Sequence, residues 1–243
     1  MRLDNYLSEA GLAKSRTRAK NLILTGKVSV DGLVVRKASF EIQPGQSVSV
    51  NSEEDFSSLG GIKLKNALEK FNISPEGKVC IDIGASNGGF TDVMLRAGAK
   101  KVYCVDVGEC ALPADMLADD RVEVRDRLNA RFISFEDIGI RAELITVDVS
   151  FISLKLILPA LIQFMNKDTA LIALIKPQFE VGRALLSKSG VVKNPREAEK
   201  AVSEVVAFAA SIGLKGLGVV EIPRLFKDKN REYTALFKLR KEE

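Results

Sequence analysis

Short apolar runs alternate with helix-like stretches from about residue 62 onward. In most of the runs nearly every residue is apolar, which is typical of strands buried on both faces of a sheet, whereas "RVEVR" alternates charged and apolar residues. Between the runs, apolar residues recur every three or four positions, as on the covered face of a helix. This alternation predicts a parallel, doubly wound α/β sheet with right-handed crossovers. The expected strands are "VCIDIG", "KVYCVDV", "RVEVR", "ELITVDV" and "TALIALIKP".

Two further apolar runs, "KGLGVVEI" and "EYTALFKLR", follow one another with no helix between them. They should therefore form an antiparallel pair at one edge of the sheet. The segment from 62 to 243 is predicted to be one Rossmann-like domain. Its expected helices are residues 62 to 72, "FTDVMLRAG", a short stretch before "RVEVR", about 153 to 165, and a long helix that begins at Pro195.

The first 50 residues follow a different pattern. Apolar residues at helical spacing predict one helix between 3 and 10 and a second after Ser15, a good N-cap residue. "KVSVDGLVV" alternates with period two around Asp31-Gly32, a strong hairpin signal, and "QSVSV" supplies a last strand. "NSEEDFSSLGG" is polar and has no period. We therefore expect a small α+β domain at 1–50, a linker at 51–61 and the sheet domain at 62–243.

The positive charge is concentrated in the small domain. The net charge at pH 7 is +4, and the first 50 residues carry the whole excess. A basic module on a neutral body suggests a polyanionic partner, whereas a solvated helix face is the simpler alternative. The basic residues expected to bind nucleic acid are Arg2, Lys14, Arg16, Arg18, Lys20, Lys27, Arg36 and Lys37.

The stretch "RLDNYLSEAGLAKSRTRAKNLILTGKVSVDGLVVRK" resembles the S4 RNA-binding fold. It contains a leading R-L-D, a helix with K-S-R-x-x-A, and then G-K-V-x-V-D-G. The resemblance covers nearly all of the small domain and implies binding of structured RNA through that helix and the hairpin. Helical RNA is held mostly by phosphate and 2′-hydroxyl contacts, which suits a basic surface.

The composition disfavours several classes of function. The chain has no histidine, so we expect no metal site, and acid–base chemistry must use Lys, Asp, Glu or Tyr. Cys80 and Cys104 lie in strand patterns and are expected to be reduced core residues. The longest apolar run, "LILPALIQFM", is shorter than the ~20 residues that span a bilayer. The N-terminus carries acids, unlike a signal peptide, so we expect a cytoplasmic protein with no membrane partner.

A glycine-rich loop follows the first strand of the sheet. It reads Gly84-Ala-Ser86-Asn-Gly88-Gly89, so the middle glycine of a dinucleotide fingerprint is replaced, and the G-K-[ST] of a Walker loop is absent. Asp106 ends the second strand, where an acid typically holds ribose hydroxyls. The loop and this acid favour S-adenosylmethionine over NAD, with a plain tight turn as the remaining alternative.

Polar residues gather where the predicted strands end. Ligands of a doubly wound sheet bind outside the carboxyl ends of its strands. The last strand runs the opposite way, so its beginning lies at this same edge. The polar residues at the edge are Asp82, Asp106, Asp126, Arg127, Asp148, Lys176 and Glu232, and Lys63 on the preceding helix could reach it.

The residues at this edge of the sheet limit which kind of methyl transfer the chain could catalyse. The N/D-P-P-Y segment common in amino-group methylation is replaced by Asp148-Val-Ser-Phe, and no cysteine nucleophile ends the fourth or fifth strand. A sugar hydroxyl remains, and a neutral lysine could draw off its proton. Lys176 ends a central strand and is better placed for this than Lys63. Carboxylates such as Asp148 and Glu232 could orient the two ammonium groups.

The sheet domain resembles the TlyA/hemolysin A family, relatives of the FtsJ/RrmJ methyltransferases. The similar segments are "GGIKL", "DIGASNGGFTDVML", "VDVG", "LNAR", "DVSFISL", "IKPQFEVG" and "NREYTALFKLR". The resemblance implies S-adenosylmethionine-dependent 2′-O-methylation of a cytidine in ribosomal RNA. The short ends favour 23S over 16S rRNA. The family's Lys-Asp-Lys-Glu tetrad would fall on Lys63, Asp148, Lys176 and Glu232.

The expected cofactor site combines the loop with the strand ends. Its residues are Asp82, Gly84, Ala85, Ser86, Gly88, Gly89, Phe90, Asp106, Val107, Asp126, Arg127 and Asp148. The chain departs from the family at "SLGGIKL", which replaces S-R-G-A-H-K-L, and at "RALLSKSG" after "EVG". Two alternatives stay open: methylation of a base or small molecule, and an RNA-binding ribosome-assembly factor with weak or vestigial methyl transfer. No segment could line the bilayer pore that the name hemolysin suggests.

Overall fold

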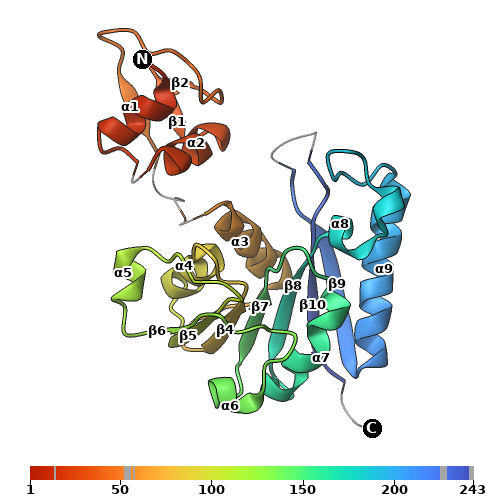
Figure 1. The fold of residues 1–243 in the computed structure, drawn as a ribbon. Coiled ribbons are helices and arrows are strands. Elements are labelled where there is room, and N and C mark those ends of the chain that lie inside the picture. The colour runs from red at the N-terminus through yellow and green to blue at the C-terminus, as the bar shows by residue number, and fades with distance from the viewer. Residues whose placement is uncertain (14, 52–55, 57, 225–228, 241–243) are drawn as a thin grey trace. The chain divides into compact units, whose positions relative to one another are not determined.

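The computed structural model describes residues 1–13, 15–51, 56, 58–224 and 229–240. The chain forms two compact units, Met1–Leu59 and Gly60–Glu243, each with a hydrophobic core of its own (Figure 1). Lys14, one of the predicted RNA-binding residues, lies outside the described residues.

The first unit packs two helices on a small sheet. Its three strands are antiparallel in the order β2-β1-β3. The helices contribute Leu3, Leu7, Ala19, Leu22 and Ile23 to the core. The elements are α1 (Leu3–Glu9), α2 (Arg16–Leu24), β1 (Val28–Val30), β2 (Leu33–Val34) and β3 (Val48–Val50).

Local signals in this unit act as the sequence predicts. The Ser15 hydroxyl accepts a hydrogen bond from the Arg18 N–H at 3.2 Å and so caps α2. Asp31 and Gly32 have φ angles of 51° and 78°, the left-handed pair that a two-residue hairpin turn requires. The Asp31 carboxylate also accepts the Ser47 N–H at 2.8 Å, which fastens the turn to the segment that enters β3.

The second unit is built on a seven-stranded sheet in the order β6-β5-β4-β7-β8-β10-β9. β4 to β8 pair in parallel, and β10 runs antiparallel to both β8 and β9. The predicted antiparallel pair is confirmed, and β10 lies on its inner side, so β9 forms the edge. The strands are β4 (Val79–Ile83), β5 (Lys101–Val105), β6 (Val122–Arg125), β7 (Leu144–Val147), β8 (Ala170–Ile175), β9 (Leu214–Glu221) and β10 (Tyr233–Leu239).

Helices connect these strands. The helix expected over 153–165 is interrupted: 3₁₀ turns at Leu154–Leu156 and Ile162–Phe164 flank α7 (Leu158–Leu161). Pro159, in the first turn of α7, lacks the N–H that would continue a longer helix. Pro195 begins a long helix as predicted. The other helices are α3 (Leu59–Phe71), α4 (Gly89–Arg96), α5 (Ala114–Leu117), α6 (Phe135–Ile138), α8 (Pro177–Glu180) and α9 (Pro195–Ser211), with a 3₁₀ turn at Arg183–Leu185.

The centre of the sheet is buried and mostly apolar, with Asp82 and Thr146 as polar exceptions that share a hydrogen bond. Every residue of β7 and of β8 is buried, as is expected of parallel strands covered on both faces. The first polar residues after these strands, Asp148 and Lys176, are partly exposed. The rigid strands therefore present their polar residues at one edge of a packed core.

Candidate active site

The sheet reverses its direction of growth between β4 and β7. From β4 the chain adds β5 and β6 on one side, and it returns to add β7 on the other. Ligands of open α/β sheets bind at such a switch point. Gly84, which follows β4, has a φ of 84°, and a Cβ on it would overlap the backbone carbonyl of Asp148. Glycine is therefore needed for the two strand ends to meet.

The glycine loop turns sharply from β4 into α4. Ser86 and Gly88 have φ angles of 47° and 75°, and the Gly88 N–H donates to the Ala85 carbonyl at 2.7 Å. Gly89 then begins α4. Ala85 and Phe90 are each only 4% exposed, so their side chains point into the core beneath the loop.

Asp82 is buried completely below the same loop. Its two carboxylate oxygens accept hydrogen bonds from the Thr91 hydroxyl at 2.7 Å and the Thr146 hydroxyl at 2.9 Å. Burial raises the pKa of this carboxyl to about 6, although the two hydroxyls oppose the shift. The side chain thus joins β4, α4 and β7, and it lies in the core rather than at the surface of the site.

Asp106, at the end of β5, organises the other side of the loop. One of its oxygens accepts the Ser86 N–H and the other accepts the Gly108 N–H, both at 2.9 Å. Each carboxylate oxygen can accept a second hydrogen bond. The neighbouring Val107 is 69% exposed. Asp106 therefore presents two oriented acceptors beside the loop.

A cleft of about 360 Å³ opens at the switch point. The predicted residues Gly84, Ser86, Asp106, Val107 and Asp148 line it. Two other segments complete the walls, and apart from their place in family-like motifs no sequence signal assigns them to the cofactor. Their lining residues are Leu128, Asn129, Ala130, Val149, Ser150, Phe151 and Ile152, with Ile157 beyond them.

Asp126 and Arg127 were predicted for the cofactor site but are not among the residues that line the cleft. The Asp126 carboxylate accepts the Cys110 N–H at 2.6 Å. The Arg127 guanidinium is 77% exposed and pairs with Glu109. Both side chains thus fix the loop that follows β5.

The four residues predicted for catalysis form two ion pairs. The Lys176 Nζ lies 2.6 Å from Asp148 Oδ1 and donates a hydrogen bond to the Ser150 hydroxyl at 2.9 Å. The Lys63 Nζ lies 2.5 Å from Glu232 Oε2. Tyr233 of β10 pairs with Ile175 of β8, so Glu232 and Lys176 are the next residues at the same end of this strand pair. The side chains of the four residues are between 11% and 25% exposed.

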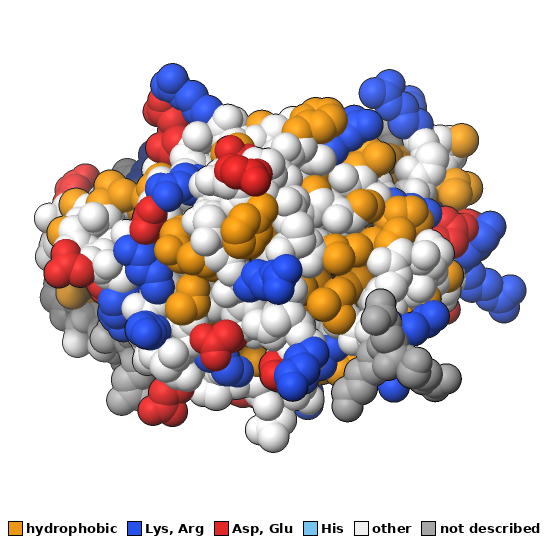
Figure 2. Space-filling view, turned by 90° about the horizontal axis from the view of Figure 1, so that it is seen from below, with side chains coloured by type: hydrophobic (Ala, Val, Ile, Leu, Met, Phe, Trp, Pro, Cys, Tyr) orange, Lys and Arg blue, Asp and Glu red, His pale blue; other side chains and the backbone are white. Residues whose placement is uncertain are grey.

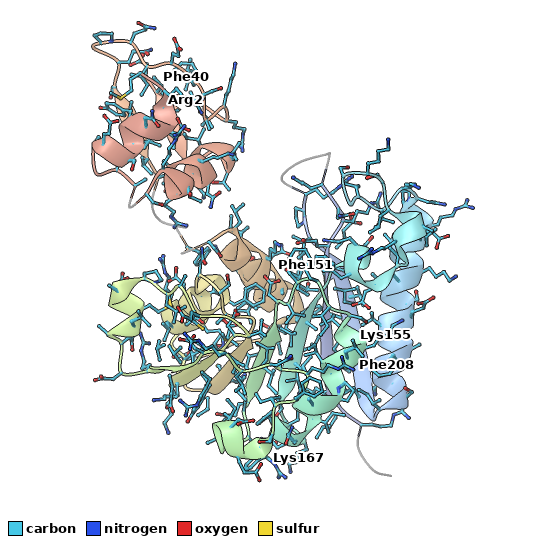
Figure 3. All side chains as sticks on the ribbon, in the orientation of Figure 1. Arg2, Phe40, Phe151, Lys155, Lys167 and Phe208 are labelled. Carbon is cyan, nitrogen blue, oxygen red and sulfur yellow. The ribbon has the colours of Figure 1, made fainter. Side chains whose placement is uncertain are left out.

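Two contacts hold the segment after β7 against α8. The Glu180 carboxylate accepts the Ser153 hydroxyl at 2.6 Å and the Leu154 N–H at 2.8 Å. The Phe151 ring lies 5.1 Å from the Phe179 ring, yet Phe151 is 91% exposed and has a φ of 64° (Figure 3). A bulky residue rarely adopts this backbone conformation, and strain of this kind concentrates at functional sites. Neither Glu180 nor Phe151 was predicted from the sequence to belong to the site.

The cysteines do not offer a nucleophile at this edge. Cys80 and Cys104 are free and buried, as expected, and burial raises the pKa of each thiol to about 12. A buried thiol in apolar surroundings is inert. Cys110 is partly buried, and burial also raises its pKa. The amines and carboxylates at the strand ends are therefore the candidate reactive groups at this edge of the sheet.

The first unit carries an organised pair of arginines. Asp4 is buried, and it accepts two hydrogen bonds from the Arg2 guanidinium at 2.9 Å and one from Arg16 at 3.2 Å. These hydrogen bonds, above all those from Arg2, lower the pKa of the Asp4 carboxyl to about 2. The two arginine side chains are 44% and 60% exposed, so their outer edges remain accessible.

The other predicted basic residues differ in their environment. The Arg36 guanidinium lies over Gly26 and contacts the Leu24 carbonyl at 3.4 Å, so it packs on the end of α2. Lys20 and Lys37 are exposed, whereas Arg18 and Lys27 are half-buried. On the face seen in Figure 2, Lys and Arg lie among Asp and Glu, in keeping with the balanced charge beyond residue 50.

Comparison with known proteins decides the family. The profile of FtsJ-like methyltransferases matches residues 56–239, and that of the S4 domain matches residues 1–48. The chain belongs to the FtsJ-like methyltransferase family. Its sheet order and its cleft at the switch point are thus those of a methyltransferase domain, preceded by an S4 domain.

Relatives within this FtsJ-like family match nearly the whole chain. The chain is 41% identical to the 16S/23S rRNA (cytidine-2′-O)-methyltransferase TlyA of Mycobacterium tuberculosis, over 96% of this chain and 87% of that protein. It is 37% identical to hemolysin A of Brachyspira hyodysenteriae, over 98% of this chain and 99% of that protein. The chain is 32% identical to the 23S rRNA (cytidine-2′-O)-methyltransferase TlyA of Campylobacter jejuni, over 88% of this chain and 89% of that protein.

Solved structures agree with the FtsJ-like fold. A structure named as a hemolysin from Streptococcus thermophilus has a TM-score of 0.76 and 37% identity, covering all of this chain and 89% of that one. A structure from Listeria monocytogenes described as an S-adenosylmethionine-dependent methyltransferase has a TM-score of 0.54 at 15% identity. It covers 76% of this chain and 100% of that one. The second likeness shows the fold alone.

Membrane-spanning and metal-binding features are absent from the described part of the chain. None of its helices is both long and apolar enough to cross a bilayer. None of its acidic and cysteine side chains gather in a group of three that could hold a metal ion.

Proposed function

We propose that this chain transfers a methyl group from S-adenosylmethionine to the 2′-hydroxyl of a cytidine in ribosomal RNA. The observation that carries the proposal is the Lys176–Asp148 pair at the switch-point cleft, which Asp148 lines, with the Lys63–Glu232 pair at the same end of strands β8 and β10. Relatives named as rRNA cytidine-2′-O-methyltransferases support this substrate. We propose 23S rRNA as the first substrate, 16S rRNA as the alternative, and the cytoplasm as the place of action.

The lining of the cleft fits S-adenosylmethionine. Asp106 keeps an acceptor site on each oxygen, which suits the two hydroxyls of a ribose. Val107, Leu128 and Ile157 offer apolar surface for an adenine ring, and Gly84 lets the backbone come close. Once bound, the cofactor would supply an electrophilic methyl group.

The remaining predicted cofactor residues would act by shaping the loops. Asp82 joins three elements beneath the glycine loop, and Asp126 and Arg127 fix the loop after β5. Ala85, Gly88, Gly89 and Phe90 would set the path of the backbone, because the two larger side chains are buried. Loss of any of them should weaken cofactor binding indirectly.

Lys176 is the proposed general base. In its neutral amine form, its Nζ would take the proton of the ribose hydroxyl and become an ammonium while the hydroxyl oxygen forms its bond to the methyl carbon. Asp148 and Ser150 orient the amine through the ion pair and the hydrogen bond. Lys63, held by Glu232, would add a positive charge near the developing alkoxide and so stabilise the transition state.

The exposed ring of Phe151 suits a nucleobase. Aromatic side chains commonly stack unpaired bases in single-stranded RNA, and this ring is almost fully exposed beside the Lys176–Asp148 pair. We propose that it packs on the base of the target cytidine. The basic residues of the S4 domain, led by the Arg2 and Arg16 pair, would hold phosphates of the surrounding RNA.

Transfer of radiolabel from S-adenosylmethionine to purified 23S and 16S rRNA tests the proposal. We expect label in RNA that lacks the modification, followed by mapping to the 2′-oxygen of one cytidine. Binding of S-adenosylmethionine without any transfer to free rRNA or to ribosomal subunits would refute the enzymatic function and favour an assembly factor. Label on a base would refute the ribose assignment.

A further inference from the structure

A second pocket of about 310 Å³ lies on the β10 side of Lys176. Pro177, which follows Lys176, forms part of its wall, together with the start of α9 and residues 229–231 before β10. The switch-point cleft lies on the β7 side of the same lysine, where Asp148 lines it. The candidate base therefore stands between two concave sites, and the cofactor proposal uses only one of them.

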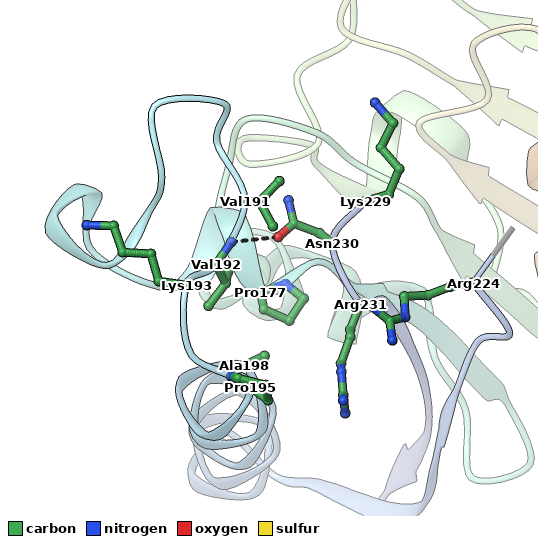
Figure 4. A pocket seen from close by; sticks show the side chains of 10 residues that line it. All are labelled: Pro177, Val191, Val192, Lys193, Pro195, Ala198, Arg224, Lys229, Asn230 and Arg231. Carbon is green, nitrogen blue, oxygen red and sulfur yellow. Dashed lines mark hydrogen bonds between the residues drawn. The ribbon is translucent and has the colours of Figure 1, made fainter. Parts of the chain in front are cut away.

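The lining of the second pocket has two parts (Figure 4). One wall is mostly apolar and is formed by Pro177, Val191, Val192, Pro195 and Ala198, together with Lys193, whose amine donates to the Ala184 carbonyl at 3.2 Å. The opposite rim carries Arg224, Lys229 and Arg231, and no acidic residue belongs to the lining among the described residues. A nucleotide needs both parts, because its base and sugar offer flat apolar faces and its phosphate needs positive charge.

Hydrogen bonds hold the pocket in shape. Asn230 accepts the Val192 N–H at 2.9 Å and donates to the Gly190 carbonyl at 3.0 Å, so it fastens the loop before α9 to the start of β10. Arg231 lies 3.4 Å from Glu221 and 3.8 Å from Glu199, which keep its guanidinium near the rim. Asn230 and Arg231 are thus held in place relative to the apolar wall.

The location of the pocket sets which nucleotide it can take. Pro177 adjoins Lys176, and Arg231 adjoins Glu232, so the pocket begins within one residue, roughly 4 Å of chain, of both catalytic pairs. The volume of about 310 Å³ is at the lower end of ligand pockets, which start near ~300 Å³, and suits one nucleotide. The target ribose itself must lie at the lysines, so this space is left for its neighbour.

We propose that this pocket binds the nucleotide next to the methylated cytidine in the RNA chain, with its phosphate at the Arg224, Lys229 and Arg231 rim. The inference rests on the proposed function and deepens it. The pocket gives the methyltransferase domain an RNA-binding site of its own. This site selects the target cytidine by its neighbouring nucleotide once the S4 domain has bound the RNA.

Charge reversal tests the rim in the full-length protein. Arg224→Glu with Lys229→Glu should raise the KM for a 23S rRNA fragment about tenfold or more, because two phosphate-facing cations are removed. The slope of log KM against log salt should fall by about one for each phosphate that is no longer neutralised. The Kd of S-adenosylmethionine should not change. Lys200→Glu, an exposed α9 residue outside the pocket, reverses one charge, as each of these two substitutions does, and should stay within about twofold of wild type.

A crosslink locates the nucleotide directly. RNA fragments with 4-thiouridine placed one position before or after the target cytidine should crosslink to residues 177, 191–195 or 229–231 from one of the two positions. Crosslinks from neither position to these segments, or a double variant that behaves as Lys200→Glu does, would overturn the inference. Equal competition by free cytidine monophosphate and by the RNA fragment would overturn its assignment to an RNA chain. If wild-type protein transfers no methyl group to rRNA at all, the proposed function itself fails first.

Discussion

At the scale of single residues, the candidate site depends on how each charge is held. Lys176 contacts the carboxylate of Asp148 and the hydroxyl of Ser150, whereas Lys63 contacts the carboxylate of Glu232. Lys176 alone of the two directly follows a buried strand at the core of the sheet. The two amines can therefore differ in function although they share an edge, and substitution can separate their roles.

Replacement of Lys176 should stop methyl transfer without releasing the cofactor. Lys176→Ala removes the proposed proton acceptor, and general-base catalysis commonly contributes ~10²–10⁴-fold. Lys176→Arg should fail as well, since guanidinium stays protonated. Single-turnover radiolabel transfer and calorimetry with S-adenosylmethionine measure the two effects. Full activity in the arginine variant would leave this residue an electrostatic role only.

Asp82 should make stability depend on pH in an unusual direction. Its pKa is about 6 in the folded chain against an ordinary 3.8, so the folded state binds more protons between these values. The contribution of Asp82 to the free energy of unfolding is therefore most favourable below pH 4, and it is lost as the pH rises through 6. The loss is about 3 kcal/mol at most, from ~1.4 kcal/mol per pH unit.

Denaturant unfolding of wild type and Asp82→Asn at several pH values isolates this effect. The asparagine variant should gain stability relative to wild type as the pH rises from 4 to 6. A difference between the two proteins that stays constant over that range would contradict the raised pKa.

At the scale of elements, the site is where a loop meets a strand end. The sequence predicted the strands of the larger sheet, because most buried parallel strands read as continuous apolar runs. It predicted the antiparallel pair because no helix pattern separates the last two runs. It did not predict the break in the helix over 153–165, which depends on Pro159. It also missed the walls of the cleft, such as Leu128 and Ile157, since only tertiary packing brings these segments to the glycine loop.

Gly84→Ala should disrupt the meeting of β4 and β7. The new Cβ would overlap the Asp148 carbonyl, and it would strain a φ of 84°. Gly139→Ala is the matched control, because Gly139 has a φ of 75° but an added Cβ there would meet open space. The control should show only the strain, about 1 kcal/mol, whereas Gly84→Ala should also lose cofactor affinity. Calorimetry and thermal unfolding measure both; equal affinity in the two variants would exclude a steric role.

Glu180 should matter for turnover through the segment that it holds. Glu180→Ala removes both hydrogen bonds to Ser153 and Leu154, so Phe151 and Ser150 lose their fixed position against Lys176. We expect kcat to fall by about tenfold or more, because small misplacement of reacting groups is costly. Cofactor affinity should fall less than kcat, because the segment forms only one wall of the cleft and Asp106 and the glycine loop are unchanged, and Glu180→Gln should recover part of the rate.

Glu69→Ala, which removes an exposed i,i+4 partner of Lys65, is the control for loss of a carboxylate. Its kcat should match that of wild type. A Glu180→Ala enzyme with unchanged kcat would show that the segment keeps its place without this tie.

At the scale of the whole molecule, charge and chemistry are divided between two units. The net positive charge lies in the first 50 residues, and the lysine–carboxylate pairs lie in the second unit. Affinity for RNA and methyl transfer should therefore be separable by mutation. The distribution of charged residues along the sequence already indicated this division. The hydrogen bonds by which Asp4 orients Arg2 and Arg16 could not be predicted from the sequence.

Reversal of charge on α2 should abolish tight rRNA binding but spare the cofactor. Arg16→Glu, Arg18→Glu and Lys20→Glu together remove cations from the predicted RNA-binding helix. The affinity of wild type should fall steeply with salt, and the triple variant should lose most of that slope, about one log unit per phosphate contact. Filter binding at several salt concentrations measures it. Equal slopes in the two proteins would mean that RNA is held elsewhere.

The insertion of β10 between β8 and β9 has a consequence for biosynthesis. Glu232 stands at the beginning of β10, so a ribosome makes it after Lys63, Asp148 and Lys176. Until β10 is made and pairs, the central strand β8 has an open side that could bind other chains. A nascent chain thus carries its glycine loop and both lysines well before the second ion pair can form. The protein should acquire activity and lose its tendency to aggregate in the same late step, when this one strand enters the sheet.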